Sequence, residues 1–163
     1  METGLTRRAF RAATWDHSGM QLTRFTDYGL RVMMYLAHQP AGQLATAGEI
    51  AAAHDISLNH IAKVVQFLAQ QGWVDSQRGR GGGLALAKPP AAYRIDQLVR
   101  ALEGDEELID CNSPPCKIAG ACALQHSLHE AREALYASLA RQTLADLLTP
   151  ALRKSIVRIR PAA

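Results

Sequence analysis

Residues 45–87 read ATAGEIAAAHDISLNHIAKVVQFLAQQGWVDSQRGRGGGLALA, and this stretch decides the fold. Its beginning predicts a helix over 45–54, because Thr46 stands near the start and Glu49 follows three residues later. That spacing is typical of a capping box, in which two side chains bind backbone N–H groups left free at a helix start. The stretch therefore opens with a short predicted helix.

A second helix is expected directly after a tight turn. Residues 55–56 make the turn, Ser57 is a good N-cap, and Gly72 ends the helix after residue 71. A short helix, a tight turn and a longer helix together predict a helix-turn-helix, whose second helix enters the major groove of DNA.

The second helix has one apolar and one polar face. The apolar positions expected to be buried are Leu58, Ile61, Val65 and Leu68. The polar stripe consists of Asn59, Lys63, Gln66 and Gln70, with His60 beside it. Asn pairs with adenine and Lys with guanine in the major groove, so Asn59, His60 and Lys63 are candidate base readers. The capping residues Thr46 and Ser57 are also part of the predicted DNA-binding set. The alternative is that the stripe is only a solvated helix face, as polar stripes usually are.

A basic, glycine-rich hairpin follows. Residues 73–77 and 84–87 are expected to be short strands, and RGRGGG at 78–83 is expected to be the turn between them. Arg78 and Arg80 on such a tip can approach the DNA backbone or enter a minor groove, where negative potential is concentrated. The helix-turn-helix and this wing predict a mainly α, winged helix-turn-helix protein that binds double-stranded DNA.

Composition excludes several classes of protein. With 163 residues, 48% of them hydrophobic, the chain can bury one core, and no run of 18 apolar residues exists that could span a membrane. Residues 20–94 carry seven basic and four acidic side chains, which is weak evidence for a phosphate-bearing partner.

Residues 1–19 lack the apolar segment of a secretory signal, so a cytoplasmic protein is expected. They are interpreted as a disordered arm or as a segment before the true start at Met20.

Further helices are expected over 23–38, 95–104 and 123–142. The last of them carries a near-heptad apolar stripe of Leu124, Leu128, Ala131, Leu135 and Leu139. Such a stripe suits packing against the same helix of a second subunit, or alternatively within its own subunit. Because a DNA reader of this size usually needs two half-sites, we expect a homodimer on a palindromic operator.

These elements divide the chain into segments. The DNA-binding domain spans 20–94, a connecting helix with a cysteine loop spans 95–122, and a dimerisation helix spans 123–148. A basic tail over 149–163 follows, and its residues 153–160 are expected to be disordered.

All three cysteines lie within twelve residues of one another. Cys111, Cys116 and Cys122 are separated by four and five residues, and Pro and Gly between them let the backbone curl around an ion or cluster. Three thiolates without a fourth cysteine suit an iron–sulfur cluster with a different fourth ligand, or a zinc site completed by His or Asp. Buried structural cysteines, or one disulfide plus a free thiol, are the remaining alternatives.

The sequence resembles the winged-helix iron–sulfur regulators that include NsrR and IscR. The resemblance covers 20–148 and is carried by LTRFTDYGLR at 22–31, ISLN at 56–59, RGRGGG at 78–83, the three cysteines and TLADL at 143–147. It implies a homodimeric repressor with one iron–sulfur cluster per subunit, [4Fe-4S] or [2Fe-2S], held by Cys111, Cys116 and Cys122.

Within this family the details resemble NsrR, the nitric oxide sensor. IscR-like members have five residues between the first two cysteines and a His three residues after the third, whereas here the gap is four and Gln125 holds the later position. The resemblance implies that Asp27 ligates the cluster of the other subunit, that nitric oxide displaces this carboxylate, and that DNA is then released. The alternative for Asp27 is pairing with Arg24 or Arg31 near the first helix.

Two other regulators fit the same residues. One is an IscR-like sensor of iron–sulfur or redox status, and the other is a zinc-stabilised transcription factor. An enzyme is not expected, because the spacing lacks Cys-x-x-Cys and no nucleophile–base pair is evident.

Overall fold

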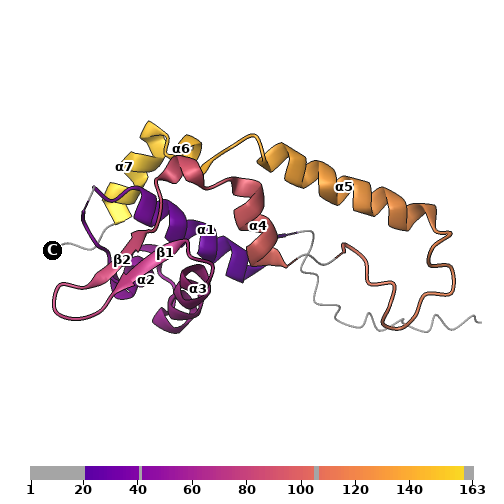
Figure 1. Cartoon of the computed structure of the whole chain (residues 1–163), viewed down its shortest axis with the longest axis horizontal. Coiled ribbons are helices and arrows are strands. Elements are labelled where there is room, and N and C mark those ends of the chain that lie inside the picture. Colours follow the sequence, from indigo (N-terminus) through magenta and orange to yellow (C-terminus); the bar gives the residue numbers. More distant parts are fainter. Residues whose placement is uncertain (1–20, 41, 105–106, 160–163) are drawn as a thin grey trace, which may run out of the picture.

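The computed structural model describes residues 21–40, 42–104 and 107–159, and it shows a mainly helical winged fold (Figure 1). In chain order its elements are α1 (Arg24–Ala37), α2 (Ala47–His54), α3 (Leu58–Gln70), β1 (Val74–Gln77), β2 (Gly83–Leu86), the 3-10 turn η1 (Pro90–Ala92), α4 (Ile95–Glu103), α5 (Ala123–Leu139), α6 (Leu144–Leu147) and α7 (Pro150–Ile159). The predicted order of helices and hairpin is confirmed.

The arm or false start expected over 1–19 lies outside the described residues. Within the described ranges no helix is both long enough and apolar enough to cross a bilayer.

The helix-turn-helix forms where its local signals place it. Thr46 Oγ1 accepts the Glu49 N–H at 3.1 Å and the Glu49 carboxylate accepts the Thr46 N–H, so the predicted capping box is present. Asp55 turns the chain with a φ of 52°, in the left-handed region that Asp tolerates better than most residues. Ser57 Oγ accepts the His60 N–H at 3.4 Å and caps the start of α3.

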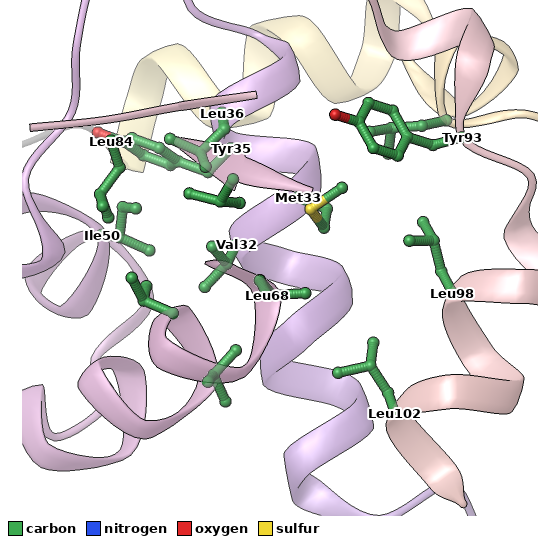
Figure 2. Packing of buried hydrophobic residues seen from close by; sticks show 14 of the residues in the cluster. Val32, Met33, Tyr35, Leu36, Ile50, Leu68, Leu84, Tyr93, Leu98 and Leu102 are labelled. Carbon is green, nitrogen blue, oxygen red and sulfur yellow. The ribbon is translucent and has the colours of Figure 1, made fainter. Parts of the chain in front are cut away.

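The core lies on both sides of α1, the central helix of the domain (Figure 2). On one side Val32 lies toward Leu68 of α3, and on the other Met33 lies toward Leu98 of α4. These four side chains are at most 1% exposed. Burial of both faces of α1 therefore fixes the recognition helix and the connecting helix to one another through a shared core.

The wing is an antiparallel hairpin whose base is tied to the start of α4. Its register pairs Val74 of β1 with Leu86 of β2. The Tyr93 hydroxyl, on a residue that is 3% exposed, donates to the Trp73 carbonyl at 2.9 Å and accepts the Lys88 N–H at 2.7 Å. One buried hydroxyl thus joins both ends of the hairpin to the segment that leads into α4.

The long helix α5 extends away from the winged domain (Figure 1). It contacts α4 through Arg100, whose guanidinium lies 3.9 Å from the centroid of the Tyr136 ring and binds the Glu133 carboxylate at 2.9 and 3.3 Å. Two hydrogen bonds to one carboxylate define the geometry of this contact better than a single ion pair would. On a different side of α5, Leu124 is 58% and Leu135 is 48% exposed.

The structure corrects two expectations. Leu58 is 53% exposed rather than buried. It is the first residue of α3, and the core covers this helix only from Ile61 onward. Residues 153–159 of the tail expected to be disordered belong to α7. Thr149 Oγ1 accepts the Leu152 N–H at 3.2 Å and Ile156 is 3% exposed, so burial of one apolar side orders a helix whose basic residues remain exposed. Residue 160 lies outside the described ranges.

Candidate DNA interface and cysteine loop

The first two turns of α3 present the three candidate base readers, Asn59, His60 and Lys63, to solvent. A hollow of about 180 Å³ between α1 and α3 is lined by Arg24, Phe25, Tyr28, His60, Lys63 and Val64. The rings of Tyr28 and His60 lie 5.9 Å apart in this hollow. Sequence reasoning missed Arg24 and Tyr28 as neighbours of this candidate reading face, because only the packing of α1 on α3 brings them there.

A wider groove of about 680 Å³ separates α3 from the wing. Its polar lining includes Thr46, Gln66, Gln70, Ser76 and Arg78. The structure therefore gathers the α2 cap, the far half of the α3 stripe and the start of the wing on one surface. Hydroxyl, amide and guanidinium groups of this kind bind phosphate and sugar oxygens as well as base edges.

The wing tip carries Arg78 and Arg80, and both are exposed. Gly79 and Gly81 have φ values of 103° and 80°, which residues with a side chain rarely adopt. Glycine at these positions lets a narrow turn carry two guanidinium groups, a shape that suits a minor groove. The hydroxyl of Ser57, by comparison, already serves as the N-cap of α3.

The three cysteines lie on the loop between α4 and α5. Cys111 and Cys122 are half-buried, Cys116 is exposed, and all three are free thiols. Partial burial raises the pKa of the Cys111 thiol, and the neighbouring Cys116 and Cys122 sulfurs raise that pKa further. A hollow of about 380 Å³ beside them is lined by Glu107, Ile109, Asp110, Cys111, Asn112 and Gln125.

Asp27 does not join the cysteines within the described chain. Its carboxylate binds the Arg31 side chain at 2.8 Å, one turn further along α1, which is the alternative that the sequence left open. Across the described ranges no three His, Cys, Asp or Glu side chains lie close enough to hold a metal ion. The donor set still fits an iron–sulfur cluster, because it offers three neighbouring thiols on an accessible loop and iron–sulfur clusters are held by thiolates. Metal binding commonly completes the convergence of such ligands.

Charged side chains tie the loop to α5. Glu107 binds Arg132 at 3.2 Å and His129 at 3.1 Å, and the Arg132 side chain is only 8% exposed. His126, which neighbours the position where IscR-like members carry a histidine, binds Glu130 at 3.4 Å on the same helix. The start of the cysteine loop is thus held against the first half of α5, next to the thiols.

Comparison with known proteins identifies the family. The family model Rrf2, described as an iron-dependent transcriptional regulator, matches residues 22–150. The chain belongs to the Rrf2 family. Members of this family are transcriptional regulators rather than enzymes, and the winged helix described above is their fold.

Solved structures of Rrf2-like regulators resemble this chain over most of its length. CymR of B. subtilis, the global cysteine regulator, is 25% identical, with a TM-score of 0.57 over 79% of this chain and 96% of that chain. CymR of Staphylococcus aureus is 26% identical, with a TM-score of 0.60 over 75% and 93%. IscR of T. potens is 23% identical, with a TM-score of 0.65 over 80% and 87%, which supports the fold alone.

Proposed function

We propose that this Rrf2-family regulator is a homodimeric repressor that binds DNA, carries one iron–sulfur cluster per subunit and releases its operator in response to nitric oxide. The observation that carries the proposal is the cysteine loop. Three thiols, Cys111, Cys116 and Cys122, lie on the loop that joins α5 to α4, the helix that shares a core with α1 and α3. A ligand bound at these thiols is therefore positioned to affect the DNA-reading helix.

The DNA-binding part of the proposal rests on two exposed surfaces. Asn59 and Lys63 on α3 offer an amide and an ammonium group to base edges, and Arg80 at the wing tip offers a guanidinium group to the DNA backbone along a minor groove. The groove between α3 and the wing supplies further polar groups for the backbone between these two contacts.

Dimerisation is supported by the exposed side of α5. Leu124 and Leu135 are 58% and 48% exposed and lie on the same near-heptad stripe. Packing against α5 of a second subunit would remove both side chains from water. This burial would stabilise the dimer by about 25 cal/mol of free energy for each Å² of apolar surface buried. A dimer also places two recognition helices for two half-sites, which must lie about one DNA turn, ~34–36 Å, apart.

In this proposal Cys111, Cys116 and Cys122 hold the cluster, and the partner subunit's Asp27 supplies a carboxylate. The cluster, when bound, supplies iron that binds nitric oxide, and a carboxylate is a harder ligand for that iron than a thiolate. An Asp27 side chain that loses the metal has Arg31 within reach, one turn along α1. A shift of α1 moves α3 with it, since the two helices share the core, and the half-site spacing then no longer matches the operator.

The test is a single anaerobic titration. The full chain is purified without oxygen, its visible absorption is recorded, and nitric oxide is added while DNA binding is followed by fluorescence anisotropy. The DNA probe is a palindromic duplex selected from a randomised pool. Cluster bands that bleach as DNA is released support the proposal, whereas a colourless, zinc-loaded protein whose DNA binding ignores nitric oxide contradicts it.

The Asp27 ligand is tested in the same assay. Asp27→Ala is compared with Asp75→Ala, which changes an exposed aspartate on β1. We expect only Asp27→Ala to change the absorption spectrum and the response to nitric oxide. An Asp27→Ala protein with an unchanged cluster and normal release of DNA would rule out the ligand role.

A further inference from the structure

We propose that Cys111 and Cys116 form a reversible disulfide bond whenever the cysteine loop carries no metal, with Cys122 remaining a free thiol. The bond itself depends only on the geometry of the loop. Its consequence, a block on cluster loading, rests on the function proposed above.

The two cysteines lie opposite each other in a small hairpin. Asn112 and Pro115 form an antiparallel bridge, so the next pair outward in the same register is Cys111 with Cys116. The Cys116 N–H donates to the Cys111 carbonyl at 2.9 Å, as expected for directly opposed residues. Opposed residues in antiparallel pairs have Cα atoms about 4.5–5.5 Å apart, within the range of about 4.4–6.8 Å that a disulfide requires.

The hairpin is held by contacts that need no metal. Asp110 Oδ1 accepts the N–H groups of Asn112 at 2.8 Å and Ser113 at 3.1 Å, which supports the turn from its first side. Side chains of directly opposed residues in an antiparallel pair lie on the same face, so the Cys111 and Cys116 side chains share one face of this hairpin. The backbone therefore holds the two cysteines opposite each other before any oxidation, at a separation that a disulfide can span.

Exposure decides the order of the reaction. Cys116 is exposed and Cys111 is half-buried, so Cys116 meets a small disulfide oxidant, such as glutathione disulfide, first. The Cys116 thiolate attacks one sulfur of the oxidant and releases one thiolate as leaving group. The Cys111 thiolate then attacks Cys116 Sγ in the mixed disulfide and releases the second thiolate. Two thiols of the protein are oxidised by two electrons, and the oxidant is reduced to two thiols after uptake of the two protons.

The consequence is a second state of the metal-free protein. The disulfide removes two of the three thiolate ligands, so the oxidised loop cannot receive a cluster until a reductant restores it. A regulator that has lost its cluster would thus respond to the thiol–disulfide balance of its surroundings before it could be reloaded.

Peptide mapping tests the bond directly. The full chain is stripped of metal under reducing conditions, desalted without oxygen, incubated in glutathione redox buffers, alkylated with iodoacetamide and digested with trypsin. Cleavage after Arg100, Lys117 and Arg132 places Cys111 and Cys116 in one peptide and Cys122 in the next. We expect peptide 101–117 to be lighter by two hydrogens and unalkylated, with Cys122 alkylated on peptide 118–132.

Two variants and a loading assay complete the test. Cys122→Ser should keep the internal bond, and Cys111→Ser should abolish it and leave only a mixed disulfide at Cys116. A covalent link between peptides 101–117 and 118–132 in the wild type, or mixed disulfides alone, overturns the proposal. Iron and sulfide are then offered to the oxidised and the reduced protein. If neither binds iron, the proposed cluster fails while the mapped disulfide stands. If the disulfide-bonded protein loads as well as the reduced one, the block on loading is refuted.

Discussion

Glu103, the last residue of α4, accepts the backbone N–H of Thr23 at 3.0 Å and 3.1 Å through its two carboxylate oxygens. Thr23 is the N-cap of α1, and its hydroxyl donates to the same carboxylate at 3.1 Å. The hydroxyl of the fully buried Thr26 also donates to this carboxylate. A negative charge at this place also interacts favourably with the N-terminal end of the α1 dipole. The helix that leads to the cysteines is thereby bonded to the helix that carries Asp27.

Removal of this carboxylate is expected to destabilise the domain. Glu103→Ala leaves a buried threonine hydroxyl and a cap N–H without their partner, so we expect a loss of about 1–3 kcal/mol in the free energy of unfolding. The control is Glu130→Ala, whose carboxylate binds His126 at 3.4 Å on the exposed side of α5 and should cost less than about 1 kcal/mol. Urea unfolding of both variants gives the comparison. Equal losses would show that the Glu103 contacts contribute no more than a surface ion pair.

Acid is expected to weaken a second helix cap. The Thr143 N–H at 2.8 Å and the Thr143 hydroxyl at 2.7 Å lower the pKa of Asp146 below its usual value of 3.8. A carboxyl whose pKa is lower in the folded state stabilises the fold above its unfolded pKa, and that contribution is lost as the pH falls through the folded pKa. The stability difference between the wild type and Asp146→Asn should therefore be largest near neutrality and shrink below about pH 4.

Thermal unfolding across pH measures this effect. Asp75→Asn, on an exposed residue of β1, serves as the matched change of charge. A difference between the wild type and Asp146→Asn that stays constant down to pH ~2 would show that the cap does not depend on the ionised carboxylate.

Local signals in the sequence account for the DNA-binding domain. The spacing of Thr46 and Glu49 predicts the start of α2, and Ser57 predicts the start of α3, because each cap is formed by residues within one turn. The arginine- and glycine-rich turn predicts the wing for the same reason. The exposed polar face of α3 also follows from the sequence, since the 3.6-residue period separates its polar stripe from the core.

Contacts between distant residues account for what the sequence did not predict. Glu103 and Thr23 are 80 residues apart, and nothing near either residue indicates the other. Leu58 fits the apolar period of α3 but lies at a helix end that no neighbour covers. The charges of the basic tail favour disorder, but Ile156 is buried in the core and this contact orders α7.

Base reading and backbone binding are expected to separate in two variants. Asn59→Ala on α3 should reduce discrimination against the wrong base at one operator position by about 1–3 kcal/mol, because a bidentate contact is lost. Arg80→Ala at the wing tip should weaken binding to all duplexes and lower the slope of log affinity against log salt by about 0.9. Fluorescence anisotropy with the selected duplex, point-substituted duplexes and a salt series measures both quantities. An Asn59→Ala protein that weakens on every sequence alike would place Asn59 on the backbone instead.

The exposed stripe of α5 predicts the oligomeric state. Leu135→Glu puts a charge in the proposed interface between subunits and should convert the dimer into a monomer, because an unpaired charge is costly to bury there. Ala137→Glu adds the same charge at an exposed position on the opposite side of α5 and should leave the dimer intact. Sedimentation velocity measures the mass of each variant, and circular dichroism confirms that each remains helical. If both variants stay dimeric, the subunits meet elsewhere, and the proposed position of Asp27 beside the partner's cysteines loses its basis.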